Sequence, residues 1–372
     1  MDIVLLIGSL ALILLGAELF TNGIEWFGRR LNLAEGAVGS VLAAVATAMP
    51  ETLIPVIAIL GPLIFGGPTE SSHAIGVGAI LGAPFMLSTL AMFVTGVAIL
   101  IFVRRGRRAT PMRINVRVLG RDVTFFVVGY AIAIGTAFLP SELSFLKWVA
   151  AGVLFVLYAV YVWLHFADAP DAGESAELSP LHASRLPGMR ARILDVDILP
   201  GERDAWELGG GTPRMRVIVS QALVALGLII LGAQVFIGAV EHLSVTIGLD
   251  RTVLALIIAP IATELPEKFN SVLWVRTGKD TLAMGNITGA MVFQSCIPTV
   301  LGLLFTSWAF SAESAIYFAS AGVAFAATIL IFGTMLSRGA LSAWTLLIGG
   351  PLYALYLYLA LFTPLGAAVA LQ

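Results

Sequence analysis

ATELPE at residues 262–267 repeats ATAMPE at residues 46–51, and this pair of stretches decides the fold. An offset of 216 residues superimposes the threonine, the proline and the final glutamate of the two stretches. Two further pairs align, LILLGAELFTNGIE (12–25) with LIILGAQVFIGAVE (228–241) at the same offset and GVGAILGA (76–83) with AMGNITGA (283–290) at an offset of 207. The chain therefore contains two copies of one unit.

The composition indicates a membrane protein. Of the 372 residues, 59% are hydrophobic and only 12% are charged, and the mean hydropathy is +0.96. Soluble domains carry about 25% charged residues, so this much apolar surface is typical of membrane-spanning helices. The net charge of −2 gives no indication of nucleic-acid binding. The single cysteine, Cys296, excludes a disulfide framework, and the first segment reads as a retained helix without a basic leader.

Apolar runs predict an all-α polytopic membrane protein with ten transmembrane helices. The expected spans are 3–27, 36–64, 74–102, 122–140, 145–166, 215–240, 249–275, 281–305, 312–335 and 341–362. Residues 1–166 form the first five-helix repeat, 167–213 a hydrophilic linker and 214–372 the second repeat. Because five is odd, the second copy enters the membrane from the opposite side. Inverted repeats are typical of secondary transporters, whose substrate site lies near the membrane midplane.

The basic residues predict an orientation. Twelve arginines and lysines lie in one set of alternate loops and two, Lys147 and Arg251, in the other set. We therefore expect a protein of the plasma (inner) membrane, with both termini outside and the linker in the cytoplasm. Acidic residues of the linker are compatible with a regulatory cation, but a solvated linker is the simpler interpretation, because the EF-hand spacing is missing.

The repeated Thr-x-x-Pro-Glu pattern suits a hard cation. Proline lacks an N–H group and leaves a carbonyl upstream without its helical donor, and glutamate adds a charged oxygen beside it. Helices 2 and 7 are therefore expected to be broken near Pro50 and Pro266. Glycines at 78, 82, 285 and 289 form Gly-x-x-x-Gly in both copies, a spacing that lets helices approach closely.

These motifs resemble those of the cation/calcium exchanger superfamily, in the sodium/calcium exchanger membrane-region family. Each of its repeats has a Gly-Thr-Ser-x-Pro-Glu-like stretch and a later Gly-Asn-x-x-Gly-Ser-Asn-like stretch. The resemblance implies a divalent-ion site with the paired carboxylates of Glu51 and Glu267. It implies that Thr47 and Thr263 contribute backbone carbonyls, and that Ser271 matches a serine following the second motif.

This chain departs from the family pattern at several polar positions. The motif serine is replaced by Ala48 in the first copy and by Glu264 in the second. Alanine also replaces the serine of the later stretch in both copies, and the polar residue beyond it is retained only as Gln294. Several ligands associated with sodium are thus missing, which favours protons as the coupling ion.

Glu264, Glu267 and Lys268 lie together in an apolar stretch. An isolated charge at a helix centre costs roughly 2.5–3.5 kcal/mol on insertion scales, so these groups must be paired, hydrated or protonated. Lys268 either acts as a built-in cation beside Glu264 or extends its amine toward the cytoplasmic interface. Glu25 and Glu241 are interpreted as interfacial, and Glu18 as an interhelical hydrogen-bonding group or an ion ligand.

The sequence predicts a secondary antiporter that exchanges Ca²⁺ for Na⁺ or H⁺ by alternating access. A proton-coupled exchanger of another cation and a homologue that no longer transports are the alternatives. An intramembrane enzyme would need a motif such as His-Glu-x-x-His, which is missing from the chain. The expected partners are inorganic cations and the lipid bilayer, with no cofactor.

Overall fold

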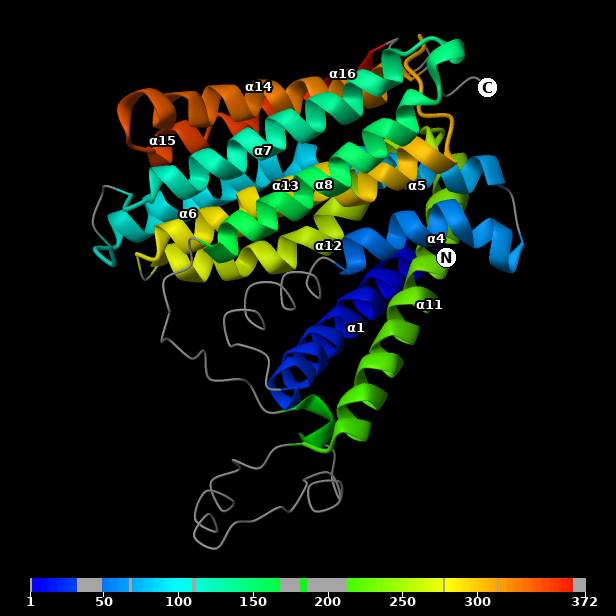
Figure 1. Cartoon of the computed structure of the whole chain (residues 1–372), viewed down its shortest axis with the longest axis horizontal. Helices are drawn as coiled ribbons and strands as arrows, with labels where there is room; N and C mark the ends of the chain where they lie inside the picture. The colour runs from blue at the N-terminus through cyan, green and yellow to red at the C-terminus, as the bar shows by residue number, and fades with distance from the viewer. Residues whose placement is uncertain are drawn as a thin grey trace, which may run out of the picture. The chain divides into compact units, whose positions relative to one another are not determined.

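The computed structural model describes most of the chain, and its regular elements are helical (Figure 1). The described residues are 2–31, 49–66, 69–108, 112–167, 181–185, 213–276, 278–312 and 314–363. The long helices are α1 (Asp2–Arg30), α4 (Met49–Phe65), α5 (Thr69–Met86), α6 (Met92–Arg104), α7 (Val116–Gly135), α8 (Leu146–Ala167), α11 (Met215–Ile247), α12 (Arg251–Arg276), α13 (Asp280–Phe305), α14 (Ala315–Arg338) and α16 (Gly349–Phe362).

Short elements complete the described part of the chain. A π-helical turn, η2 (Leu87–Ala91), joins α5 directly to α6, so that one predicted span contains three elements. The remaining short elements are the 3₁₀ turns η3 (Thr136–Phe138), η4 (Ser141–Leu143) and η5 (His182–Arg185), and the single-turn helix α15 (Ala343–Leu346).

The ten predicted spans each coincide with a helix. Among the described residues, eight helices are long and apolar enough to cross a membrane, and two shorter apolar helices, Glu51–Ile64 and Arg251–Ile261, lie in the second and seventh predicted spans. The spacing of the apolar runs therefore predicted the helices correctly, because about 20 apolar residues are needed to cross a bilayer as a helix.

The expected break in the seventh span is not observed in its backbone. α12 remains helical from Arg251 to Arg276, across both Pro260 and Pro266. A proline inside a helix removes one hydrogen bond and bends the axis, and the flanking turns keep their helical geometry when neighbouring helices support them. The corresponding break near Pro50 lies next to residues 32–48, which are outside the described residues.

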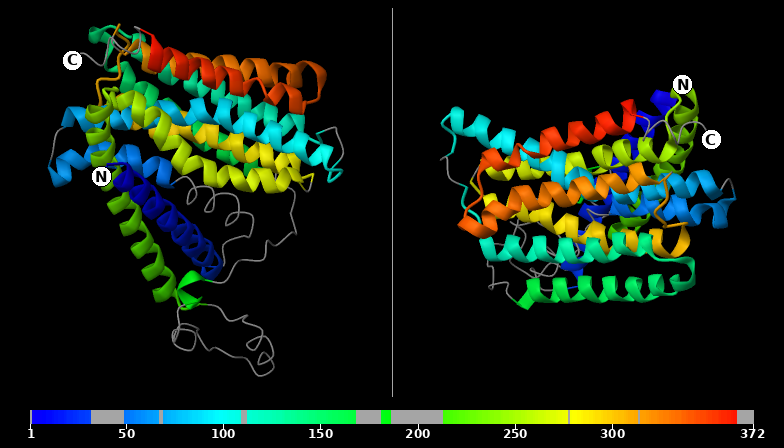
Figure 2. Two further views of the ribbon diagram at one scale, coloured as in Figure 1. Left: turned by 180° about the vertical axis from the view of Figure 1, so that it is seen from behind. Right: turned by 90° about the horizontal axis from the view of Figure 1, so that it is seen from above.

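The described residues form two compact units, and each contains residues from both repeats. The larger comprises Met1–Ile7, Glu51–Tyr161 and Ala233–Gln372, and the smaller comprises Gly8–Pro50 and Val162–Gly232. This division reflects helix packing and does not test the repeat and linker boundaries, which stay a prediction. Within the larger unit, long helices run side by side along a common direction (Figure 2).

The α5–α12 seam is the most extensive helix contact in the larger unit. A Cβ atom on Gly78 would lie 2.3 Å from the carbonyl oxygen of Thr252, and one on Gly82 would lie 2.2 Å from that of Leu256. Only glycine leaves room for the two backbones to come this close. The predicted role of Gly-x-x-x-Gly in close packing is therefore confirmed for the first copy.

An ion pair ties the loop after α6 to the start of α13. Arg108 donates from Nη1 and Nη2 to the two carboxylate oxygens of Asp280 at 2.7 and 2.8 Å, and both side chains are at most 4% exposed. Nη1 also donates to the Val275 carbonyl near the end of α12, at 2.9 Å. This two-pronged geometry fixes the turn between α12 and α13, because a fork-shaped guanidinium matches a carboxylate in one orientation.

The smaller unit is built on α1 and α11, which lie side by side (Figure 1). A Cβ on Gly16 would lie 2.7 Å from Cγ1 of Ile229, and a Cβ on Gly232 would lie 2.7 Å from Cγ1 of Ile13. Both pairs are related by the 216-residue offset, so each helix inserts its isoleucine beside the glycine of the other. The repeat seen in the sequence is therefore a two-fold contact in space.

A piece of the central linker docks on this helix pair. The backbone N–H groups of His182 and Ala183 donate to Asn22 Oδ1 at 2.9 Å and to Gln221 Oε1 at 2.8 Å. The amide of Gln221 in turn donates to Asn22 Oδ1 at 3.1 Å. Buried amide side chains on both helices thus hold the linker segment in place.

Candidate cation-binding site

Of the predicted site residues whose side chains the structure describes, Glu51 lies on α4, three lie on α12 and Gln294 lies on α13. Glu51 is in the first turn of α4 and is 7% exposed, and Thr263 of α12 is 2% exposed. They line one cavity of about 10 Å³, with Ile54, Ala79, Ala83, Ala259 and Pro260. The structure therefore brings the glutamate of the first copy beside the threonine of the second.

The cavity is small and mostly apolar. Its volume is enough for about one water-sized particle. The α5 wall consists of Ala79 and Ala83, which contribute no side-chain oxygen. The Thr263 hydroxyl donates to the Ala259 carbonyl at 3.0 Å. The Ala259 carbonyl oxygen thus accepts from this side chain as well as from the helix backbone. Glu51 therefore supplies the charged oxygens of this cavity.

Pro260 explains how α12 approaches α5 at this level. A proline has no N–H group, so the Leu256 carbonyl, four residues earlier, has no helical donor. That carbonyl lies against Gly82, where a Cβ would come within 2.2 Å of it. The glycine of one copy and the proline of the other are thus complementary at the same contact.

Two further acidic candidates are placed differently. Glu264 is 1% exposed beside Thr263 on α12, but it is not among the residues that line the cavity. The side chains of Glu267 and Lys268 lie outside the described part of the structure, as does all of Thr47. The pairing of Glu51 with Glu267 and the two interpretations of Lys268 remain predictions.

Ser271 lies at a contact between α12 and α13. Its hydroxyl donates to the Ala283 carbonyl at 3.2 Å and accepts a hydrogen bond from Asn286 Nδ2 at 3.2 Å. The sequence prediction of site residues omitted Asn286. Its match at the 207-residue offset is Ala79, which lines the cavity beside Glu51. This match within the repeat is the signal in the sequence that could have identified Asn286.

Gln294 is buried in α13, which stays α-helical from Asp280 to Phe305. Pro298 removes the helical donor for the Gln294 carbonyl, and the Thr299 hydroxyl donates to that oxygen at 2.9 Å instead. The 207-residue offset matches Leu87–Ala91, the π-helical turn after α5, to residues 294–298. The first copy therefore has a π-helical turn, which is common at functional sites, where the second copy keeps an α-helix.

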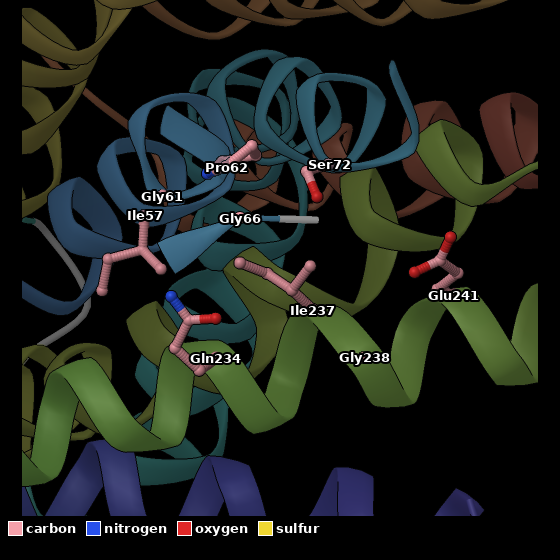
Figure 3. Close-up of a pocket in the computed structure, with 9 residues that line it drawn as sticks. All are labelled: Ile57, Gly61, Pro62, Gly66, Ser72, Gln234, Ile237, Gly238 and Glu241. Carbon is pink, nitrogen blue, oxygen red and sulfur yellow. The ribbon is translucent and has the colours of Figure 1, made fainter. Parts of the chain in front are cut away.

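A second, larger cavity lies between α4, α5 and α11. It measures about 170 Å³, and Figure 3 shows Gln234, Ile237 and Glu241 extending from α11 toward the ends of α4 and α5. Glu241, predicted to be interfacial, is 33% exposed there, and Arg251 Nη1 lies 3.9 Å from its carboxylate. The cavity is lined in part by the polar side chains of Ser72, Gln234 and Glu241, which suit a hydrated ion better than an apolar ligand.

Two more glutamates of the repeated helices, Glu18 and Glu25, lie on α1, and Glu25, predicted to be interfacial, is partly exposed. Glu18, considered as an ion ligand or an interhelical group, is 69% exposed, with its carboxylate 3.4 Å from His182 Nε2. Among the described residues, no group of three or more histidine, cysteine, aspartate or glutamate side chains is close enough to hold a metal ion. A cation here would therefore need carbonyl and water oxygens beside any carboxylate.

Ten helices, two inverted copies and a buried glutamate beside an α12 proline define a secondary transporter for cations. The family model for the sodium/calcium exchanger protein matches residues 1–167 and 218–362. The match covers more than half of the chain and includes both copies. The chain therefore belongs to the sodium/calcium exchanger family and is an integral membrane protein of cation antiport.

Individual relatives agree with this membership. The protein named "Putative antiporter CaxA" from Alkalimonas amylolytica is 26% identical over 299 residues, which is 79% of this chain and 77% of the relative. The crystal structure of the H⁺/Ca²⁺ exchanger CAX superposes with a TM-score of 0.64 at 16% identity, covering 99% of this chain and 84% of that one. The sodium-calcium exchanger NCX_Mj superposes at 0.53 with 14% identity, covering 97% and 99%. Both solved structures have the same fold as this chain.

Proposed function

We propose that this protein exchanges Ca²⁺ for H⁺ across the membrane by alternating access. The observation that carries the proposal is the cavity lined by Glu51 of one copy and Thr263 of the other, whose α5 wall is alanine. A carboxylate can take part in binding a divalent ion, and it can bind a proton without further ligands. Sodium sites need several neutral oxygens, and Ala79 and Ala83 supply none from their side chains.

The proposed ligands follow from this arrangement. Glu51 and Glu267 bind Ca²⁺ when ionised and carry protons in the return direction. Thr47 and Thr263 contribute oxygens from the backbone. Ca²⁺ prefers six to eight oxygens, so water completes the shell.

The remaining predicted residues have supporting roles in the proposal. Glu264 and Gln294 are buried and lie near the motif residues in the sequence, and they contribute polar groups to the site. Ser271 and Asn286 hold α12 against α13 through their hydrogen bond. The larger cavity beside Glu241 serves as an outer vestibule, where a carboxylate attracts cations.

The test is ion flux through the purified protein in liposomes. With the lumen acidic, we expect uptake of radioactive calcium together with a rise of luminal pH, reported by a trapped dye. Replacing external K⁺ with Na⁺ should leave both signals unchanged. Calcium uptake that requires a luminal Na⁺ gradient and moves no protons would contradict the proposal and establish sodium coupling.

Two other outcomes identify the alternatives from the sequence. Proton movement driven by another divalent or monovalent cation, with no calcium flux, indicates a proton-coupled exchanger of that cation. No flux of any cation from a folded protein indicates a homologue that does not transport. Thermal unfolding in detergent shows whether the protein in the inactive liposomes is folded.

The orientation is a separate part of the proposal, with both termini outside. It is supported by the twelve basic residues in one set of loops against two in the other. Glu70 at the start of α5 and Arg107 after α6 are both exposed and suit cysteine substitution in a Cys296→Ala background. An impermeant thiol reagent on intact cells should label Glu70→Cys and not Arg107→Cys, and the reverse pattern would invert the topology.

A further inference from the structure

Asp122 is a buried carboxylate that the proposed cation site does not use. It lies inside the membrane-spanning helix α7 and is 1% exposed. Oδ1 accepts a hydrogen bond from the Tyr161 hydroxyl at 3.1 Å, and Oδ2 accepts one from the Thr288 hydroxyl at 2.6 Å. The partners come from α8 and α13, so three helices meet at this group. An ionisable side chain inside a membrane is costly, and its presence there points to function.

The hydrogen bonds around Asp122 suit two protonation states. Thr288 has one hydroxyl proton and two acceptors within reach, Asp122 Oδ2 at 2.6 Å and the Met284 carbonyl at 3.1 Å. With Asp122 ionised, Thr288 donates to the carboxylate. With Asp122 protonated, its new O–H donates to Thr288, which turns its own proton to Met284. Each state leaves the carboxyl and the hydroxyl with hydrogen-bond partners.

The surroundings hold the hydroxyl groups in position. Tyr161 packs against Tyr158, with ring centroids 6.0 Å apart, and a Cβ on Gly289 would lie 3.3 Å from the Tyr161 hydroxyl. The titratable and charged groups facing the site in the described residues are Arg121 beside it on α7, the two tyrosines on α8, and Cys296 on α13 close to Tyr158. A change of charge at Asp122 therefore acts on its contacts with both α8 and α13.

This contact is connected to the helix of the proposed cation site. Thr288 and Asn286 are two residues apart on α13, within the motif GNITGA. Asn286 is hydrogen-bonded to Ser271 of α12, which is four residues after Glu267. α13 is thus held on one side by Asp122 and on another by the ion-site helix. A different hydrogen bond at Thr288 changes how firmly α13 is fixed.

In the first copy, α5 has no hydroxyl at the position that matches Thr288. The match of Thr288 at the 207-residue offset is Leu81, which is fully buried and offers no hydroxyl. The carboxylate therefore modifies only one of the two motif helices, which breaks the two-fold equivalence of the copies.

We propose that Asp122 is a second proton-binding site, outside the cation site, and that its protonation switches the hydrogen bond between α7 and α13. One proton from solution forms the O–H bond of the carboxyl group, and the Thr288 proton changes its acceptor from Asp122 to Met284. Its role in transport rests on the proposed H⁺ coupling, whereas proton binding itself does not.

Infrared difference spectroscopy of the purified protein tests proton binding without transport. Acidification should produce a carboxylic-acid C=O band that is missing in Asp122→Asn and kept in Glu70→Gln, whose side chain is exposed. An identical difference spectrum in Asp122→Asn would overturn the proposal and leave Asp122 as a fixed hydrogen-bond acceptor.

Thr288→Val provides a second test if Asp122→Asn does not fold. Valine keeps the shape of threonine and removes the hydroxyl, so the band should move to the higher frequency of a less strongly hydrogen-bonded acid. An unmoved band in a folded Thr288→Val protein would also refute the assignment. Thr328→Val on α14 is the matched control, because its hydroxyl bonds only within its own helix in the described contacts.

Transport gives a separate readout. In Asp122→Asn the amide N–H₂ donates to Thr288 as the protonated acid would, so the rate of exchange should depend less steeply on pH while calcium affinity is unchanged. An unaltered pH profile would separate Asp122 protonation from the transport cycle. Loss of all flux in the wild type would refute the proposed function and leave the infrared result standing.

Discussion

The two copies meet symmetrically in one part of the molecule and asymmetrically in another. In α1 and α11, Gly16 and Gly232 receive each other's isoleucine at the same separation of 2.7 Å. In α5 and α13 the matched positions differ in both backbone and side chains. α5 continues into a π-helical turn, whereas α13 stays α-helical across Pro298, with the Thr299 hydroxyl bonded to the Gln294 carbonyl. Duplication thus preserved the α1–α11 contact more faithfully than these two helices.

The difference has a physical reason. A close helix crossing depends on a missing Cβ, and any replacement there forces both helices apart. Polar groups along a helix can be exchanged one at a time, provided that each buried group finds a partner. The symmetric contact therefore tolerates little change, and the motif helices can acquire separate roles. Four predictions test this comparison, in decreasing order of expected effect.

The largest effect is expected at the matched glutamates. Glu51→Gln and Glu267→Gln should each abolish calcium exchange in liposomes, because glutamine keeps the shape and loses the charge that binds Ca²⁺. Glu70→Gln, at the exposed start of α5, is the control and should transport normally. Normal exchange in only one of the two variants would show that the site is asymmetric, and normal exchange in both would remove it from these residues.

Gly82→Ala should strongly destabilise the protein. Its new methyl group would lie 2.2 Å from the Leu256 carbonyl oxygen, a backbone atom that cannot rotate away. Overpacking of this kind costs about 1–3 kcal/mol, measured as a lower thermal unfolding temperature in detergent. Gly322→Ala on α14 has nothing within 4 Å of the new atom and should be neutral or stabilising by up to about 1 kcal/mol. Equal stability of the two variants would contradict the close α5–α12 contact.

Gly16→Ala and Gly232→Ala should destabilise by similar amounts, because their contacts are equivalent. Each new methyl meets an isoleucine side chain and a backbone carbonyl of the other helix, so the loss should be about 1–3 kcal/mol. Ile229→Ala should partly rescue Gly16→Ala, and Ile13→Ala should partly rescue Gly232→Ala. Rescue with the partners exchanged, or a large difference between the single variants, would show that the pair is not two-fold.

The smallest effect is expected at Thr299. Thr299→Val removes the donor to the Gln294 carbonyl, whose helical donor is already missing at Pro298, and should cost about 1 kcal/mol. Thr328→Val is the control, because the Ala324 carbonyl that it bonds keeps its helical N–H group. Thermal unfolding that ranks Thr328→Val below Thr299→Val in stability would mean that the proline-freed carbonyl has another donor.

The sequence predicted the helices because bilayer thickness imposes a minimum length on every apolar run. It also predicted the inverted copies, because shared letters such as Thr263, Pro266 and Glu267 persist at a constant offset. The break in α12 was predicted incorrectly. A proline removes one hydrogen bond, and the packing of neighbouring helices decides whether the helix is interrupted there.

The candidate site was only partly predictable. Glu51 and Thr263 were found through their motif, and the structure places them on the same cavity. Asp122 is the first residue of the predicted span 122–140, and the motif comparison did not use it. Asn286 was quoted in a motif but acquires meaning only through its contact with Ser271.

The sequence by itself determined the membrane class, the ten spans, the repeats and the candidate carboxylates. These follow from local composition and from periodic similarity, which need no knowledge of neighbours. Helix packing in the folded protein is needed to see that Glu51 and Thr263 share a cavity, that Arg108 forms an ion pair with Asp280 and that Asp122 links α7 to α13. Each of these pairs is more than 150 residues apart, and a hydrogen bond or shared cavity between them exists only once helix packing brings the side chains together.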